Sequence, residues 1–372
     1  MPRQDIPLFR VRVSDGVSEA LRSVLESGYL ADGEKVAEFA RLIANYVGNP
    51  NVVMVSDVSA GITLALYLAG VRPGDEVIVS PMCCTATTMP IANLSARPVW
   101  CDVDPSTGML DAEQIPGLIS QRTKAILFTH WGGNVAESEA VRAIAHEHGL
   151  STVEDASEGF GAEAGGKHLG NDTADFTVYS FYATKHLTTG EGGAIFCASI
   201  QDAERAEWLK RYGIRKTTFR LPDGDLNPES DIPEAGYNFP MNNIAAAIGI
   251  EQMKTVADTV ARHHENGRFF DEALAGVPGL TLLRRRIDAR SAYWVYTVLA
   301  ERRDDLKVAL RERGIVAQRL HLRNDRYSCF PPSTIPLPGV DIFDCQTLAI
   351  PCGWWVGPES REMIAAAIRR GW

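Results

Sequence analysis

From Val52 onward, short apolar runs of sequence alternate with segments of helical periodicity. The apolar runs span 52–55, 76–80, 98–101, 125–128, 151–153, 175–180 and 194–197, and helical spacing covers 59–70, 85–94, 136–148 and 202–212. Strands that are apolar throughout and are joined by helices are typical of a mostly parallel sheet with helices on both faces. The pattern therefore predicts an α/β fold, preceded by two helices at 15–27 and 33–48.

The last hundred residues show a different pattern. Strands expected at 294–299 and 315–322 mix with helices expected at 303–313 and 358–370, after a helical pattern over 243–274 that is long enough to connect domains. A chain of 372 residues can form two cores. We therefore expect a large α/β domain over residues 1–255 and a smaller α+β domain over residues 256–372. The polar stretch 216–232 is expected to be a loop that acts as a lid or a subunit contact.

Composition excludes several classes of protein. Hydrophobic residues at 45% and charged residues at 23% are typical of a globular chain. A formal net charge of -10 argues against nucleic acid or an anionic membrane as a partner. The seven cysteines are odd in number and lack CxxC spacing, so we expect reduced thiols and no metal site. Without a signal-like segment or a spanning apolar run, the expected location is the cytoplasm.

Lys185 has unusual neighbours for a lysine. It follows the aromatic and hydroxyl-bearing stretch Tyr179-Ser-Phe-Tyr-Ala-Thr and precedes a turn rich in threonine and glycine. An exposed lysine is protonated up to about pH 10.4 and is a poor nucleophile. Apolar surroundings would lower the pKa of the amine and suit it to forming a Schiff base with a carbonyl. The alternative is a solvated lysine in a turn.

Other polar residues stand at the ends of predicted strands, where open α/β sheets bind ligands. Ser59 begins a helix, so it either helps to bind a phosphate or only caps the helix. Asp155 ends an apolar strand and needs a positive partner such as a pyridinium nitrogen, unless it is a helix cap. Ser180 and the stretch from Cys84 to Thr87 lie at further strand ends. Together these residues indicate a site for pyridoxal phosphate (PLP).

Three stretches make the sequence recognisable: Asp155-Ala-Ser-Glu-Gly-Phe-Gly-Ala, then Ser180-Phe-Tyr-Ala-Thr-Lys-His-Leu-Thr-Thr-Gly-Glu-Gly-Gly, then Gly236-Tyr-Asn-Phe-Pro-Met-Asn-Asn. With them, most of the chain resembles the nucleotide-sugar aminotransferases, the DegT/StrS family of fold-type-I PLP enzymes. The resemblance implies a large domain with a mostly parallel sheet of the seven-stranded type between helices. It also implies a homodimer whose sites lie at the subunit interface.

The resemblance implies a role for each matching residue. Lys185 would form the internal aldimine with PLP and shuttle protons, with pyridoxamine phosphate arising in the half-reaction, and Asp155 would keep the pyridine nitrogen protonated. The other matching positions are Ser59, Ala60 and Ser180 at the phosphate, Asn238 reaching the phosphate from the other subunit, Cys84, Thr87 and Glu158 in the cofactor wall, and Tyr29 beside the sugar.

Several positions depart from the family's pattern. Cys84 replaces an aromatic residue that stacks on the ring, and Val58 replaces a glycine of the phosphate loop. Glu158 replaces a Gln or His near the ring hydroxyl, so we expect either a raised pKa or a side chain that points away. Pro240 replaces an arginine that holds the nucleotide phosphates. Arg319, Arg323 or Arg326 could supply that charge, although an arginine-rich turn is as often solvated surface.

The sequence predicts a PLP-dependent aminotransferase that takes an amino group from an amino acid, by resemblance glutamate, to a nucleotide-linked keto-sugar. His130 and His186 are further candidates for substrate contact, with structural roles as the alternative. One competing hypothesis is a PLP-dependent sugar dehydratase, but that branch has a histidine in place of Lys185. The other is a regulatory protein that binds PLP or sugar without catalysis.

Overall fold

The computed structural model describes residues 5–372. Among these residues the largest sheet has seven strands in the order β1-β11-β10-β7-β6-β2-β3, and only β11 runs antiparallel to its neighbours. The strands are β1 (Val52–Val55), β2 (Glu76–Val79), β3 (Arg97–Trp100), β6 (Thr123–Thr129), β7 (Ser151–Asp155), β10 (Phe176–Ser180) and β11 (Gly193–Cys197). The predicted α/β fold with a mostly parallel seven-stranded sheet is confirmed.

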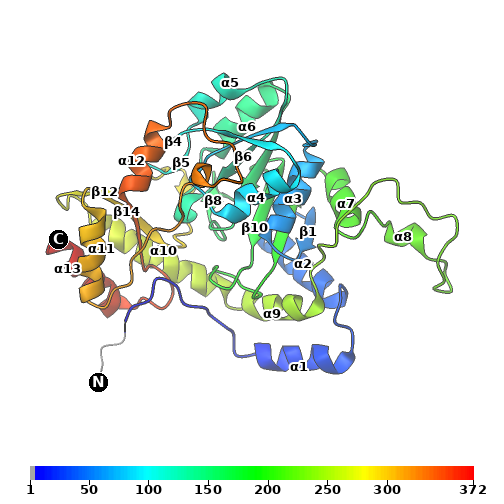
Figure 1. The fold of residues 1–372 in the computed structure, drawn as a ribbon. Coiled ribbons are helices and arrows are strands. Elements are labelled where there is room, and N and C mark those ends of the chain that lie inside the picture. Colours follow the sequence, from blue (N-terminus) through cyan, green and yellow to red (C-terminus); the bar gives the residue numbers. More distant parts are fainter. Residues whose placement is uncertain (1–4) are drawn as a thin grey trace.

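Helices cover both faces of this sheet (Figure 1). The helices of the large part are α1 (Val17–Ser27), α2 (Glu34–Val47), α3 (Val58–Leu68), α4 (Thr85–Asn93), α5 (Ile115–Leu118), α6 (Ser138–Glu147), α7 (Ile200–Leu209), α8 (Lys216–Phe219) and α9 (Asn243–Met253). Alternate residues of the strands face different layers: Val53 and Val55 pack with α3, whereas Met54 packs with α2 and α9. Because both faces are buried, the strands carry the continuous apolar runs seen in the sequence.

The C-terminal part has a smaller antiparallel sheet in the order β12-β14-β15. Its elements are α10 (Val256–Ala273), β12 (Leu280–Leu282), β14 (Tyr296–Ala300), α11 (Arg303–Glu312), α12 (Pro338–Gln346), β15 (Thr347–Ile350) and α13 (Pro358–Arg369). Its core also takes in Ile6 from the other end of the chain. The division at residue 255 stays a prediction.

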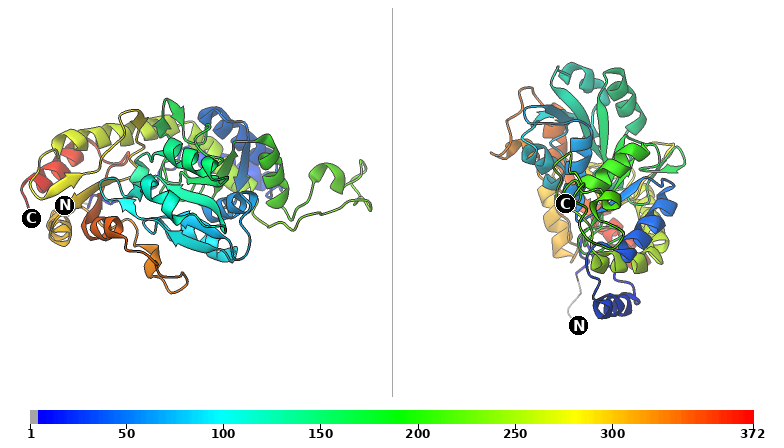
Figure 2. Two further views of the ribbon diagram at one scale, coloured as in Figure 1. Left: turned by 90° about the horizontal axis from the view of Figure 1, so that it is seen from above. Right: turned by 90° about the vertical axis from the view of Figure 1, so that its right-hand side faces the viewer.

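Short elements complete the fold. They are β4 (Val103–Asp104) paired with β5 (Met109–Leu110), the small sheet of β8 (Glu163–Ala164), β9 (Lys167–His168) and β13 (Ala289–Arg290), and the 3-10 turns η1 (Ala112–Gln114), η2 (Trp131–Gly133) and η3 (Asn324–Arg326). The segment that carries α8 projects from the body as an extended arm in Figure 1 and in the left view of Figure 2. We call residues 215–235 the arm.

Two expected elements differ in the structure. The helix expected over 243–274 is broken between α9 and α10, where Thr255 has a non-helical backbone with φ -122°. The Ser14 hydroxyl contacts Thr255 Oγ1 at 3.1 Å and donates to Gln252 Oε1 at 2.8 Å, so the N-terminal segment holds this break. The stretch 315–322 is no strand, because its two bridges, from Ile315 to Ile6 and from Gln318 to Ala349, are isolated and do not extend into a ladder.

Candidate active site

A cavity of about 820 Å³ lies at the carboxyl ends of β1, β2, β6, β7 and β10. Parallel strands bring their carboxyl ends to one edge of the sheet, so residues far apart in the sequence meet there. The predicted residues that line this cavity are Ser59, Cys84, Thr87, His130, Asp155, Glu158, Ser180 and Lys185. A cavity of this volume can hold a small-molecule ligand.

Lys185 enters the cavity from the turn after β10. Its side chain is 9% exposed, and Nζ lies 3.4 Å from the centroid of the Trp294 ring and 3.9 Å from Glu158 Oε1. Burial lowers the pKa of the amine, although the charges of Glu158, Cys84 and Asp155 oppose this shift. The amine therefore loses its proton more readily than a surface lysine, as a Schiff-base lysine requires.

Asp155 lies at the end of β7 and is 5% exposed. Its Oδ2 accepts a hydrogen bond from Thr87 Oγ1 at 2.6 Å, and its Oδ1 accepts one from the Ser157 N–H at 3.0 Å. Within residues 5–372, no lysine, arginine or histidine forms an ion pair with it. A buried carboxylate is costly without a cation, so Asp155 fits a positively charged ligand group in the cavity.

The first turn of α3 forms another part of the wall. Val58 and Ser59 line the cavity there, Ser56 and the N-cap Asp57 line it just before the helix, and Ser180 lines it from the end of β10. A helix N-terminus attracts anions, so this region fits a phosphate. The N–H of Ala60, in contrast, donates to Asp57 Oδ1 at 2.9 Å, and Ala60 is not among the lining residues. The geometry therefore gives no support to Ala60 as a phosphate donor.

Glu158 differs from its sequence-based expectation. Its side chain lines the cavity, and Oε1 accepts a hydrogen bond from His321 Nε2 at 2.8 Å while Oε2 accepts one from the Gly132 N–H at 2.6 Å. Burial would raise its pKa, but the charge and hydrogen bond of His321, the charge of Lys185 and the Gly132 N–H together hold the pKa below its usual value. Neither alternative expected from the sequence, a raised pKa or a side chain that points away, describes Glu158, because the sequence did not show that His321 would be a partner.

Two aromatic residues of the site were missed in the sequence. Trp294 covers the Lys185 amine and donates from Nε1 to the Thr184 carbonyl at 2.8 Å. Trp131 lines the cavity and meets the His321 ring edge-on, with centroids 5.5 Å apart. Trp294 precedes β14 in the C-terminal part, and no sequence motif marks its approach to the lysine. Cys84, where the family has a stacking aromatic, caps α4, and burial raises the pKa of its thiol.

The other predicted residues lie away from this cavity. Tyr29 is 81% exposed, and Asn238 is exposed. His186 is buried and donates from Nε2 to the Ala292 carbonyl at 3.0 Å. Arg319 pairs with Asp344 at 3.4 Å, and Arg323 pairs with Asp325 and Asp341, so both charges are compensated within the chain. Their roles toward a substrate stay predictions.

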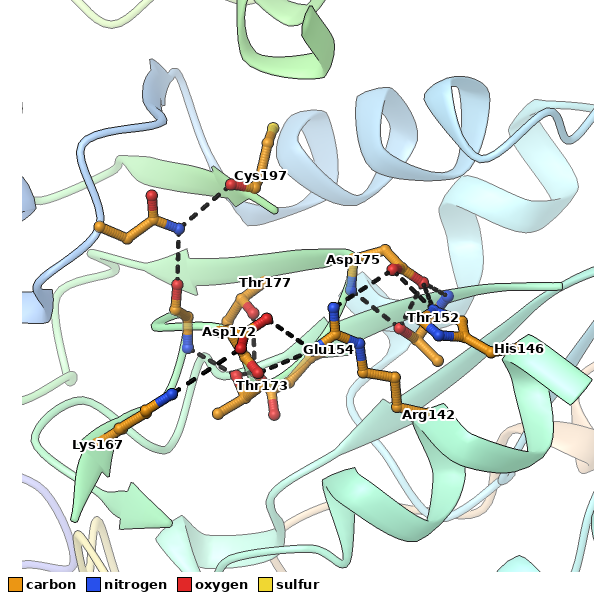
Figure 3. Close-up of polar contacts among 12 residues, drawn as sticks. Arg142, His146, Thr152, Glu154, Lys167, Asp172, Thr173, Asp175, Thr177 and Cys197 are labelled. Atoms are coloured by element: carbon orange, nitrogen blue, oxygen red, sulfur yellow. Dashed lines mark hydrogen bonds and ion pairs between the residues drawn. The ribbon is translucent and has the colours of Figure 1, made fainter. Parts of the chain in front are cut away.

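His130 reaches the cavity wall, but both its ring nitrogens face partners in the protein. Nδ1 accepts a hydrogen bond from the Ala136 N–H at 3.0 Å, and Nε2 lies 3.0 Å from Glu154 Oε1. Glu154, a residue of β7, also accepts hydrogen bonds from Thr173 and Thr177 (Figure 3). These contacts favour a structural role for His130.

The comparison with known proteins agrees with this geometry. The model of the DegT/DnrJ/EryC1/StrS aminotransferase family matches residues 13–368. The chain belongs to this family. Its members include solved structures that superpose over nearly all of the chain, and the large sheet and smaller C-terminal part are the fold of PLP-dependent sugar aminotransferases.

Three relatives of this DegT/DnrJ/EryC1/StrS family protein illustrate the similarity. AtS13 from Actinomadura melliaura is 35% identical, with a TM-score of 0.94 over 100% of both chains. The sugar aminotransferase CalS13 from Micromonospora echinospora is 34% identical, with a TM-score of 0.93 over 99% of this chain and 100% of CalS13. The spore coat polysaccharide biosynthesis protein SpsC from Bacillus subtilis is 30% identical over 309 residues, which are 82% of this chain and 79% of SpsC.

From residue 5 to residue 372, no group of three or more His, Cys, Asp or Glu side chains is arranged to hold a metal ion. Over the same residues, no helix combines the length and the apolar character needed to span a bilayer.

Proposed function

We propose that this protein is a PLP-dependent aminotransferase that moves an amino group from glutamate to a keto-sugar linked to a nucleotide. Membership of an aminotransferase family and the likeness to a sugar aminotransferase support the reaction class. The observation that carries the proposal is the pairing, in one cavity, of the desolvated Lys185 amine with the Asp155 carboxylate, which has no cation of its own.

Besides Lys185, the residues present fit PLP at two points. Asp155, held by Thr87 and the Ser157 N–H, would accept a hydrogen bond from the protonated ring nitrogen. Ser59 and Ser180, with the N-terminus of α3, would hold the phosphate. When bound, PLP supplies a ring that withdraws electrons from the carbon that loses its proton.

The chain's own groups then have separate tasks. Lys185, as a neutral amine, would accept at Nζ the proton that the α-carbon of the donor loses, and would deliver it to a different carbon, so that it does not go back to the donor. Asp155 keeps a negative charge fixed at the far side of the cavity, because two donors orient both of its oxygens. The ring of Trp294 lies over the amine and shields it from water, which strengthens the electrostatic interactions around it.

A covalent trap tests the proposal. Wild-type protein with PLP, reduced by borohydride, should carry the cofactor's mass on the peptide that contains Lys185, and Lys185→Ala should carry none. With glutamate and a panel of nucleotide keto-sugars, wild type should release 2-oxoglutarate and an aminated sugar, and Lys185→Ala should not. The control is Lys307→Ala, which changes an exposed lysine on α11. Unchanged transfer by Lys185→Ala would refute the proposal.

The same assay separates the competing hypotheses. A protein that binds PLP but leaves glutamate and every sugar unchanged would be a binding protein without catalysis. Loss of water from a sugar without amine transfer would indicate a dehydratase. Either result contradicts the aminotransferase proposal.

We further propose that the protein is a homodimer with a site shared between the subunits. The arm projects from the body and exposes Leu221, Leu226 and Ile232, and the exposed Asn238 lies just beyond it in the sequence (Figure 2). Sedimentation equilibrium should give twice the chain's mass, and replacing Leu221 and Leu226 by serine should shift the protein toward the monomer. A wild-type protein that is monomeric at micromolar concentration contradicts this proposal.

A further inference from the structure

The Glu158 carboxylate stands between two basic side chains from different parts of the fold. Its Oε1 is 2.8 Å from His321 Nε2 and 3.9 Å from Lys185 Nζ. Lys185 follows β10 in the large sheet, whereas His321 belongs to the segment between α11 and η3. One oxygen atom therefore faces both bases, and the shorter contact is with the histidine.

This arrangement matters because a carboxylate near a buried lysine favours the protonated amine. The attraction between opposite charges grows as the local dielectric constant falls, and a charged lysine is neither a nucleophile nor a base. The other groups that face the amine act in the same direction, since Asp155 and Cys84 favour the charged form and the Trp294 ring attracts a cation. Burial is the influence that opposes them.

The geometry points to a way in which the protein limits the effect of Glu158. We propose that His321 is a positioning residue that binds the Glu158 carboxylate and so prevents Glu158 from forming a close ion pair with Lys185, leaving the lysine free to act as a neutral amine. A distance of 2.8 Å allows a hydrogen bond and 3.9 Å does not. The second carboxylate oxygen is fixed by the Gly132 N–H at 2.6 Å, so the group cannot turn toward the lysine without losing a donor.

His321 is itself held in place. Its ring packs edge-on against Trp131, with an angle of 89° between the ring planes. Three residues further on, Asn324 is buried and anchors the segment to the turn after β2. Its N–H donates to the Pro81 carbonyl at 2.9 Å, and its Nδ2 donates to the Cys83 carbonyl at 2.8 Å. The histidine thus approaches Glu158 on a fixed segment of the C-terminal part.

The inference rests on the proposed role of Lys185, but it can be tested without the cofactor. Full-length protein, freed of any cofactor by dialysis against hydroxylamine, is labelled with trace acetic anhydride over a range of pH. Mass spectrometry then compares the acetylation of the Lys185 peptide with that of exposed Lys307. Only neutral amines react, so the pH dependence reports the protonation of Lys185.

The two partners of the pair should have opposite effects. His321→Phe keeps a ring against Trp131 but removes the hydrogen-bond donor, so Glu158 acts on Lys185 alone, and labelling at a fixed pH below the pKa of Lys185 should slow by roughly threefold or more. Glu158→Gln removes the attraction, and labelling should become faster. In the double variant, His321→Phe should have no further effect, because it acts through Glu158.

Controls separate this role from simple loss of structure. A merely structural His321 would open the site when replaced, and Lys185 would then label faster, as an exposed lysine does. His146→Gln is the matched control, because His146 contacts Asp175 at 3.0 Å in an exposed pair away from the cavity (Figure 3). Labelling of Lys185 that is unchanged or faster in His321→Phe overturns the inference. If His321→Phe does not fold, faster labelling in Glu158→Gln still supports the role of the carboxylate, and unchanged labelling there overturns it.

The borohydride trap keeps the two proposals apart. If no cofactor attaches to Lys185, the proposed function fails while the labelling result stands. If the cofactor attaches but the variants label alike, the function stands and the inference about His321 fails.

Discussion

Trp294 lies over the amine of Lys185, with Nζ 3.4 Å from the centroid of its ring, and donates a hydrogen bond to the carbonyl of the preceding residue, Thr184. The ring of Phe9 stacks on the ring of Trp294, with centroids 4.9 Å apart. One tryptophan thus connects the N-terminal segment, the C-terminal part and the lysine turn. The position of Lys185 depends on packing between segments that are far apart in the sequence.

Replacing Trp294 should therefore destabilise the protein, and alanine should cost more than phenylalanine. Trp294→Phe keeps an aromatic ring but loses the hydrogen bond to Thr184, at a cost of about 1 kcal/mol. Trp294→Ala also leaves a cavity, at a cost of about 3–5 kcal/mol. Urea unfolding followed by circular dichroism measures both. Tyr29→Phe changes an exposed aromatic residue and should have no effect, and equal stabilities for all variants would contradict this account.

The hydroxyl of Thr87 should stabilise the fold through Asp155. Thr87→Val has nearly the same shape but leaves one oxygen of a buried carboxylate without its donor, at a cost of about 1–3 kcal/mol. Thr87→Ser keeps the hydroxyl and should lose less. The free energies of unfolding of wild type, Thr87→Val and Thr87→Ser at pH 7 measure this contribution. A valine variant as stable as the serine variant would show that the hydrogen bond to Asp155 does not stabilise the fold.

Glu154 should make the free energy of unfolding depend on pH in the acidic range. Burial would raise its pKa, but His130 and the hydroxyls of Thr173 and Thr177 hold the pKa below the usual value of 4.5. The stabilisation is therefore complete above pH 4.5 and is lost as the pH falls through the lower pKa of the folded state. Glu154→Gln should be less stable at pH 7 and should show a smaller loss of stability in acid. Glu113→Gln, at an exposed position, is the control for urea titrations at several pH values.

His263 should make the free energy of unfolding depend on pH over a higher range than Glu154 does. Its ring packs against His186, with centroids 4.5 Å apart, and burial lowers the pKa of His263 from 6.5 to about 4. Between these values the unfolded chain binds a proton that the folded chain does not, so stability falls as the pH drops from 6.5 toward 4. His263→Asn can still donate to the Tyr293 carbonyl but cannot titrate.

Stability of the asparagine variant should accordingly vary less with pH in this window, even though lost packing lowers it at pH 7. His146→Gln, at an exposed histidine, is the control for replacing a histidine elsewhere in the fold. Identical slopes in wild type and His263→Asn would exclude His263 as the titrating group.

The sequence by itself determined the large sheet and one end of the site. Apolar runs joined by helices are sufficient to predict parallel strands, and parallel strands bring their carboxyl ends together. This is why the sequence alone predicts that Asp155, Ser180 and Lys185 lie at one site. The pattern is local, since each residue is recognised by the strand that directly precedes it.

Only the tertiary structure decided which residues complete that cavity. Trp294 and His321 come from the C-terminal part, and they reach Lys185 and Glu158 because Phe9 and Asn324 hold their segments against the large sheet. No periodicity or spacing in the sequence encodes such contacts, because they depend on how separate layers pack. The ionisation of Glu158 follows the same rule: its pKa is set by a histidine 163 positions away in the chain, which the fold brings to 2.8 Å.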